Sequence, residues 1–467
     1  MIEKYYDGAI EQVAAGLGTV EKNYLLVRYS GQFSVENLND TKQLEKNEDI
    51  FVQVHEFETG EITCAYEPYL TMICDGFRRY MTGTFEEFME TCDVYYLHRP
   101  VLLGYFNQDN TGREEIILLD EVAYEQERML AALERMLCAI ADRHPVLFVL
   151  NRFQLASKST MQLTARFLKC ENCNIGLVLG VSDIQAMPEF LVPDWEMLYE
   201  TLDDGSKIYH IGNSGRKKEE TIDDEKYVDY GSEKVYRKLQ NMVEFLDFDQ
   251  AAYYLETIER KIKFDNLLVD DAARFRMWLL FVKVSILRQD IPKALEICED
   301  LEKIHLAGKE EECAYEQDYL IATAYMYQGK LKEALEMAGE TYRIAGKMSD
   351  DYRMFLSELL EAKIQMSGWY NIFFCAQDVK IKESLIQNLI RYNYRNHLAH
   401  VYIYAYDNKP EIVKKANQSE ELLIYFSRGI RIAKKLGNEY LINMAYQKNI
   451  MLSSTNGMYE ISLLYSV

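Results

Sequence analysis

The chain has 467 residues, and 75 of them are Asp or Glu against 52 Lys or Arg, so its formal charge at pH 7 is −23. This balance leaves few cations to cluster against phosphate groups, so we expect neither a direct nucleic-acid partner nor an anionic membrane surface as a partner. Apolar residues make up 48% and charged residues 27%, as in ordinary globular domains, which excludes wholesale disorder. The length allows two to four domains, each with its own core.

The cysteine pattern, together with the search for a secretory signal and for a transmembrane segment, indicates the compartment. The nine cysteines are an odd and scattered set, which is not the pattern of a disulfide framework. The first residues carry no basic segment followed by an apolar one, and no window approaches 18 consecutive apolar residues. We therefore expect a cytoplasmic protein with reduced thiols.

The first part of the chain alternates between strand and helix patterns. Between Glu121 and Arg143 apolar residues recur at helical spacing, and the pattern stops before Pro145. Four short apolar runs predict strands, at residues 24–29, 50–54, 145–150 and 175–180. The last two are continuous apolar runs on either side of a helix, as in a parallel sheet covered on both faces. Strand, helix and strand in this order predict an α/β domain over residues 1–212.

A polar linker and a helical domain follow. Gly, Ser, Asn and charged residues dominate from Asp203 to Glu220, which is typical of a linker, and we place it at residues 213–232. Residues 233–467 contain almost no proline and read as one helix after another.

The helical part has an internal repeat. Ala294 and Ala334 occupy equivalent positions 40 residues apart, and Gly329 falls at the turn between two helices. The segment Arg431–Ala433 repeats Arg343–Ala345 at a distance of 88 residues, about twice a repeat of 44. Each helix pair of such an array buries its apolar face only by stacking on the next pair, so we expect an all-α solenoid of tetratricopeptide (TPR) type in a right-handed superhelix.

The end of the chain favours a truncated array. Residues 458–467 are still apolar and helix-like, whereas a terminal repeat normally carries a polar outer face. The helical domain is therefore predicted to continue beyond Val467 into an output domain or to be covered by another chain.

Residues 145–183 resemble the ATPase core of the signal-transduction NTPases, the STAND class, which includes large LuxR-type transcription regulators and ATPase-linked cyclases. That family shows an apolar strand, two acidic residues, a short polar segment, a helix and a second strand, and here residues 145–150, 151–160 and 177–183 follow that order. The segment Ala65–Leu70 is similar to the stretch that precedes a helix in these proteins. The resemblance implies a P-loop-NTPase-like (AAA-like) α/β domain joined to a TPR array in a bacterial regulator.

The positions that carry hydrolysis in that class have changed. The phosphate-binding loop ends in Gly-Lys-Ser or Gly-Lys-Thr, because its backbone N–H groups and the lysine hold phosphate and the hydroxyl holds Mg²⁺. No such tripeptide occurs in the chain, and only Gly31 is a plausible remnant of the loop. The two acidic positions are Asn151 and Arg152, and the arginine at the end of the next strand is Asp183. We interpret the domain as a degenerate pseudo-ATPase with no cofactor and these four residues as nucleotide-binding remnants.

Three functions follow from this interpretation. The first is a non-catalytic signalling scaffold that binds protein partners through the TPR-like array, as part of a larger bacterial regulator, with a homo-oligomer left open. The second is a STAND-type switch that binds ATP or ADP with Mg²⁺, hydrolyses it weakly or not at all, and controls transcription or a cyclase output domain. The third is an enzyme of an unrecognised type.

One aromatic and basic segment is a candidate protein-binding surface. Tyrosine and arginine together are the composition of interface hot spots, although most tyrosines of such an array belong to the repeat core. The candidate residues are Arg391, Tyr392, Tyr394, Arg395, Tyr402, Tyr404 and Tyr406.

Three further patterns have ordinary structural interpretations. The run Ile116–Glu121 ends in Asp-Glu like a metal-holding strand, but without a phosphate loop we interpret it as a strand end followed by the acids of a helix N-terminus. Cys170 and Cys173 form a single CxxC with no second ligand pair, so we expect no metal. His397 and His400 are three residues apart and are interpreted as helix surface.

Overall fold

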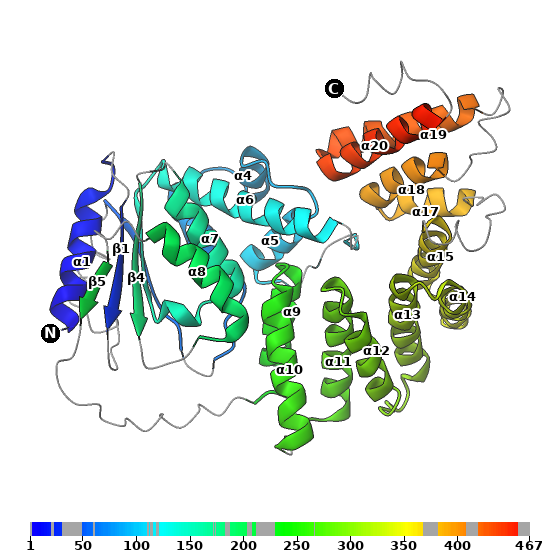
Figure 1. The fold of residues 1–467 in the computed structure, drawn as a ribbon, viewed down its shortest axis with the longest axis horizontal. Coiled ribbons are helices and arrows are strands. Elements are labelled where there is room, and N and C mark those ends of the chain that lie inside the picture. Colours follow the sequence, from blue (N-terminus) through cyan, green and yellow to red (C-terminus); the bar gives the residue numbers. More distant parts are fainter. Residues whose placement is uncertain are drawn as a thin grey trace. The chain divides into compact units, whose positions relative to one another are not determined.

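In the computed structural model the chain forms two compact units. The first consists of residues 1–94, 98–112 and 125–269, and the second of residues 95–97, 113–124 and 270–467 (Figure 1). The structure describes residues 2–19, 23–29, 49–58, 61–109, 112, 115–117, 121–170, 172, 174–182, 187–202, 208–211, 229–265, 267–367, 382–407 and 419–455. Within these ranges no helix is both long and apolar enough to cross a bilayer.

The first unit is built on a five-stranded sheet in the order β2-β3-β4-β1-β5. All its strand pairs are parallel. The strands are β1 (Asn23–Tyr29), β2 (Phe51–Glu56), β3 (Val146–Asn151), β4 (Ile175–Ser182) and β5 (Ile208–Ile211). Every residue of β3 and β4 is buried, as the continuous apolar runs predict, because helices cover both faces. The expected α/β domain with a parallel sheet is confirmed.

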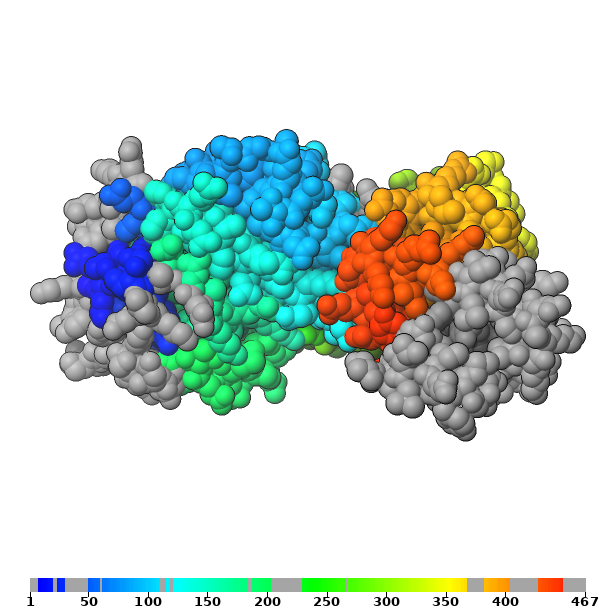
Figure 2. Space-filling view, turned by 90° about the horizontal axis from the view of Figure 1, so that it is seen from above, coloured from blue at the N-terminus to red at the C-terminus, as the bar shows by residue number. Residues whose placement is uncertain are grey.

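Helices cover the sheet on both sides (Figure 1). On one face α1 (Ile2–Gly16) packs Ile10 and Val13 against Val27 and Val149. On the other face Phe148 of β3 packs edge-to-face against Tyr69, at 4.7 Å between ring centroids. The helices of this second layer include α3 (Tyr69–Tyr80), α6 (Val122–Ala141), α7 (Lys158–Lys169) and α8 (Val192–Leu202). The space-filling view shows the light-blue to cyan part of the chain, which contains α3, α4 (Phe85–Thr91), α5 (Arg99–Asn107) and α6, as one closely packed surface (Figure 2).

Two helices predicted for the helical domain belong to the first unit instead. They are α9 (Glu233–Glu244) and α10 (Phe248–Phe264). Lys238 of α9 bonds the Glu61 carboxylate at 2.8 Å, and the buried Asp247 accepts from the Ser159 backbone N–H at 3.0 Å. The structure therefore moves the boundary from residue 232 to about residue 269, because these polar contacts bind the helix pair to the α/β domain.

The second unit is all-α, and consecutive helices of it pack against one another from α11 to α20. Its helices are α11 (Asp271–Leu287), α12 (Ile291–Leu301), α13 (Glu310–Gln328), α14 (Leu331–Lys347), α15 (Asp351–Met366), α17 (Glu383–Arg391), α18 (Arg395–Asp407), α19 (Ser419–Leu436) and α20 (Glu439–Thr455). Ala294 and Ala334 are both fully buried, and Gly329 ends α13 in the left-handed conformation. The predicted helical repeat is confirmed.

One turn recurs between the helices. After α9, α11, α13, α14, α17 and α19 a residue with positive φ is followed by one whose N–H bonds the carbonyl five residues earlier. In the two segments that the sequence shows as repeats, these residues are Ser349-Asp350 and Gly437-Asn438. Asp350 and Asn438 then cap the next helix, accepting from backbone N–H groups at 2.9 and 3.0 Å. The recurrent turn explains why the two segments resemble each other.

A short segment from the first half of the sequence belongs to the second unit. Ile116 packs against the core formed by α15, α17 and α18, and the Glu121 carboxylate accepts from the Asn438 amide at 3.3 Å. Ile116 and Ile117 have no regular secondary structure, so the strand predicted at 116–121 is wrong over these residues. Contacts with distant helices, and not a sheet, partly bury the apolar side chain of Ile116.

Candidate functional site

The carboxyl ends of the parallel strands form the edge at which open α/β sheets bind ligands. The chain runs from β1 to the edge strand β2, and later crosses from β4 past β1 to β5. The last residues of β1, β2, β3 and β4 are Tyr29, Glu56, Asn151 and Ser182. Asn151, which the sequence predicts as a nucleotide-binding remnant, therefore lies at this edge.

A buried hydrogen bond joins two of these strand ends. The Tyr29 hydroxyl donates to Asn151 Oδ1 at 2.7 Å, and both residues are shielded from solvent. Since β4 lies between β1 and β3, the tyrosine side chain spans β4, whose Ser182 is the residue paired with Tyr29 in the register. Burial raises the pKa of Tyr29 to about 12, so the hydroxyl stays protonated and donates.

Arg152 forms an ion pair at the same edge. Its backbone is left-handed, with φ of 53°, and its Nε lies 3.4 Å from Glu56 Oε1. The Arg152 side chain is 26% exposed, so part of the guanidinium can still meet a ligand. The ion pair offsets the charge of Glu56, the strand-end carboxylate beside Asn151 in the register of β2 and β3.

The side chain of Gln154 makes two hydrogen bonds to the backbone at the end of β4, as a neighbouring strand would. Gln154 donates to the Ser182 carbonyl at 3.0 Å and accepts from the Ser182 N–H at 3.3 Å. Hard cations such as Mg²⁺ are usually bound by carboxylates. The buried side chain at the end of β3, Asn151, is an amide and not a carboxylate. Among the described residues no group of three His, Cys, Asp or Glu side chains is placed to hold a metal ion.

The other two predicted remnants, Gly31 and Asp183, lie outside the described residues. The structure brings Asn151 and Arg152 to one edge, but it adds a residue that the sequence interpretation missed. Tyr29 is 122 positions from Asn151 in the chain, and its place as the last residue of an apolar strand was the signal available for it.

The predicted protein-binding segment is divided between surface and core. Arg391 and Arg395 are exposed, whereas Tyr394 and Tyr402 are buried and belong to the repeat core. Tyr392 is half-buried and stacks on Phe355 with ring centroids 4.9 Å apart. The side chains of Tyr404 and Tyr406 lie outside the described residues. As a surface, the segment is therefore corrected to its two arginines and the edge of Tyr392.

His397 is in the core, and not on the helix surface as its spacing predicted. Its Nδ1 lies 2.6 Å from Glu115 Oε1, and burial lowers its pKa to about 4. Glu115 also accepts from the backbone N–H groups of Asn396 and His397 at the start of α18. No local pattern in the sequence reveals this carboxylate, which is 282 residues from its partner.

The CxxC pattern is only partly described. Cys170 Sγ lies 3.7 Å from Cys138 Sγ of α6, and Cys173 is outside the described residues. Burial raises the pKa of Cys138, which keeps its thiol protonated.

Comparisons with known proteins support neither a family nor a function for this chain. No family model matches the sequence, and no curated protein matches it. Among solved structures, a signal transduction ATPase with numerous domains (STAND) protein with a tetratricopeptide repeat sensor, from Pyrococcus horikoshii, is similar at 10% identity. The similarity covers 95% of this chain and 80% of that one with a TM-score of 0.41. A score of this size does not establish a common fold, so the fold described above depends on the strand order and the helix packing alone.

Proposed function

We propose that this chain is a non-catalytic regulatory scaffold, with a pseudo-ATPase as its first unit and a helical second unit that binds a partner protein. The observation that carries the proposal is the buried hydrogen bond from the Tyr29 hydroxyl to Asn151 at the end of β3. It occupies the amide oxygen at the position where the ATPases that the sequence resembles carry a carboxylate.

The chemistry of that position argues against turnover. Nucleotide hydrolysis relies on a carboxylate that holds Mg²⁺ and on groups that position the attacking water. The Asn151 amide is neutral, and its oxygen is already bonded inside a closed site. The Arg152 guanidinium adds a positive charge close by, which would repel a divalent cation.

An assay of phosphate release from ATP by the purified full chain, with and without Mg²⁺, tests this part of the proposal. We expect no release above buffer. The double variant Tyr29→Phe/Asn151→Asp returns a carboxylate to the strand end, and we expect it to stay inactive because no Gly-Lys-Ser/Thr loop accompanies it. Magnesium-dependent release from the wild type that disappears in Asn151→Ala would refute the pseudo-ATPase.

A second candidate function is nucleotide binding without hydrolysis, as a switch that controls transcription or a cyclase output. It is favoured by the partly exposed guanidinium of Arg152, which suits a phosphate oxygen. Calorimetric titration with ATP and ADP, with and without Mg²⁺, decides it. Heat that is lost in Arg152→Gln would support this function, and the absence of both heat and a thermal shift would eliminate it.

Partner binding is assigned to the exposed arginines of the second unit. The Arg391 guanidinium lies over the Tyr392 ring at 5.2 Å, and that of Arg395 lies over the Tyr96 ring at 5.8 Å. A cation that is attracted to an aromatic ring samples fewer positions, which lowers the entropy lost when a partner docks.

Quantitative affinity capture with the wild type and the double variant Arg391→Glu/Arg395→Glu tests this assignment. We expect a specific set of partners to be lost from the double variant and kept by Arg343→Glu, an exposed arginine of α14. Sedimentation of the same variants shows whether the partner is a second copy of the chain. Identical partners and identical sedimentation for all three proteins would contradict the assignment.

A further inference from the structure

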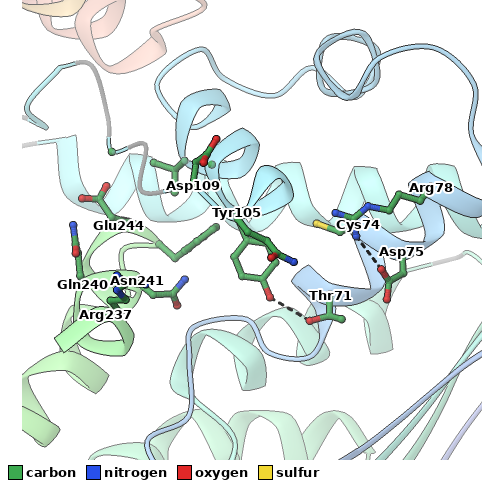
Figure 3. Close-up of a pocket in the computed structure, with 15 residues that line it drawn as sticks. Thr71, Cys74, Asp75, Arg78, Tyr105, Asp109, Arg237, Gln240, Asn241 and Glu244 are labelled. Atoms are coloured by element: carbon green, nitrogen blue, oxygen red, sulfur yellow. Dashed lines mark hydrogen bonds and ion pairs between the residues drawn. The ribbon is translucent and has the colours of Figure 1, made fainter. Parts of the chain in front are cut away.

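A cavity of the first unit lies away from the carboxyl edge of the sheet. It has a volume of about 470 Å³ and is lined by α3, α5 and α9 (Figure 3). Arg78 bonds Asp75 at 3.1 Å. Arg237 Nε lies 3.2 Å from Glu233. Both arginines of the lining are therefore paired within the protein, and the cavity does not indicate which ligand it would take. A pair of thiols elsewhere in the same unit indicates a more definite chemistry.

Cys138 and Cys170 meet where α6 contacts the end of α7. Their Sγ atoms are 3.7 Å apart, which is about the contact distance of two sulfur atoms. Cys138 lies in the last turn of α6, and Cys170 is the C-terminal cap residue of α7. The two residues are 32 positions apart in the chain, so the fold and not the local sequence brings them together.

Polar contacts before and after the two cysteines hold the pair in place. One helical turn before each cysteine, Arg166 Nε bonds the Glu134 carboxylate at 2.7 Å. One turn after Cys138, the Asp142 carboxylate accepts from the Asn172 amide at 3.0 Å. Both segments are thus joined on either side of the thiols, which keeps the sulfur atoms close together. Groups held in this way react as if they were present at a high local concentration.

Both thiols are within reach of a small reagent. Cys138 and Cys170 are each only partly buried, whereas Cys74, Cys92 and Cys298 are buried. Burial still raises the pKa of Cys138, so that thiol keeps its proton. Since the thiolate is the nucleophile in thiol chemistry, Cys170 is the sulfur that reacts first and Cys138 the one that follows.

We propose that Cys138 and Cys170 are a site of reversible oxidation, at which a low-molecular-weight disulfide such as oxidised glutathione converts the two thiols into a cross-link between α6 and the end of α7. The sulfur atoms need to approach from 3.7 Å to the roughly 2.0 Å of a disulfide bond. The cross-link closes a loop of the chain that contains β3 and α7, and with them Asn151 and Arg152. This site does not depend on the pseudo-ATPase assignment.

The reaction consists of two thiol–disulfide exchanges. The Cys170 thiolate attacks one sulfur of oxidised glutathione; a protein–glutathione disulfide forms, the glutathione disulfide breaks, and the first glutathione leaves with the proton that Cys170 lost. Cys138 then gives up its proton, and its sulfur attacks Cys170 Sγ. The second glutathione leaves with that proton. The two protein thiols lose two electrons in all, and oxidised glutathione is reduced to two glutathione thiols.

Mass spectrometry of the full chain after oxidation tests the site. The chain is incubated with oxidised glutathione, its remaining thiols are alkylated, and it is digested with trypsin without reductant. We expect the peptide of residues 136–143, which contains Cys138, to be linked to the peptide that begins at Cys170, and the link to disappear on addition of dithiothreitol. Cys313, a partly buried cysteine of α13, is the matched control and should not appear in a cross-link.

A second set of variants identifies the sulfur atoms. No Lys or Arg lies between Cys170 and Cys173, so trypsin leaves both in one peptide. We expect the cross-link to be kept in Cys173→Ser. Adding Cys138→Ser to this variant should stop the exchange at a mixed disulfide of glutathione with Cys170. Adding Cys170→Ser to it instead should leave Cys138 as a free thiol.

The proposal is overturned if Cys138 is recovered alkylated at every ratio of oxidised to reduced glutathione, or if the cross-link is absent from Cys173→Ser. Amide hydrogen exchange of the oxidised chain gives an independent readout. Exchange over α6 and α7 that is slower than or equal to that of the reduced chain supports a bond within the native fold. Faster exchange would show that the bond distorts the fold, and would also overturn the proposal.

Discussion

Glu115 should be among the most important side chains for the stability of the second unit. Its buried carboxylate accepts from the Tyr96 hydroxyl at 2.7 Å, the Asn396 N–H at 3.2 Å and the His397 N–H at 2.7 Å. Its Oε1 also lies 2.6 Å from His397 Nδ1. The carboxylate thus fixes the start of α18 to a segment that comes from the first half of the sequence.

Glu115→Ala leaves these buried donors without an acceptor. Removing one member of a buried, charged hydrogen-bond network costs about 3–5 kcal/mol. Glu115→Gln keeps one acceptor oxygen and loses the charge, so we expect about half that loss, roughly 1.5–2.5 kcal/mol, since hydrogen bonds to charged groups contribute about 1.5–3 kcal/mol each. The loss should appear in the free energy of unfolding of the second unit.

Urea denaturation of the full chain, with hydrogen exchange followed by mass spectrometry, measures this change and assigns it to a unit. We expect faster exchange over α18 and its neighbours and little change in β1–β4. Glu439→Gln, an exposed acid in the first turn of α20, is the matched control and should stay within about 0.5 kcal/mol of the wild type. The reasoning fails if Glu115→Ala is as stable as this control, because the segment would then not be docked in solution.

Three further changes have defined outcomes. In Gly176→Ala the new Cβ would lie 2.8 Å from Val13 Cγ1 and 3.0 Å from Leu147 Cδ1, so we expect thermal unfolding to show a loss of about 1–3 kcal/mol. The pKa of His397, lowered by burial to about 4 from about 6.5 when unfolded, means that the unfolded state binds the proton first. Its contribution to stability is intact above about pH 6.5 and is lost as the pH falls toward 4, by about 2 kcal/mol at pH 5 in urea titrations. Asp350→Ala removes the cap of α15 and should cost about 1 kcal/mol by urea denaturation.

Each of these changes has a matched comparison. Gly346→Ala places a methyl group in open space on α14 and should stabilise that helix by up to about 1 kcal/mol, so equal losses for the two glycine variants would contradict the packing argument. His397→Gln removes the titrating group, and a pH dependence as steep as that of the wild type would rule out His397 as its source. Asp351→Ala changes the neighbouring exposed acid, and it should cost less than Asp350→Ala if the cap is responsible.

Much of the secondary structure follows from patterns within short stretches of the chain. The runs at β3 and β4 are apolar at every position because both faces of the sheet are covered, and this alone indicates parallel strands. The helix pairs of the second unit are marked by small residues such as Ala294 and Ala334, because close helix crossings leave no room for larger side chains. The primary sequence likewise shows that the residues at the end of β3 are an amide, Asn151, and a cation, Arg152, and not two acids.

Contacts between distant residues determine the rest. Nothing near Asn151 in the chain indicates that the Tyr29 hydroxyl bonds its amide oxygen. Likewise, nothing near His397 indicates that Glu115 is its hydrogen-bond partner. The assignment of α9 and α10 to the first unit and the cavity beside α9 likewise arise from several elements meeting. Hydrophobic periodicity is a local property that any window of residues displays, whereas a hydrogen-bond partner or a gap between helices exists only once the whole chain has packed.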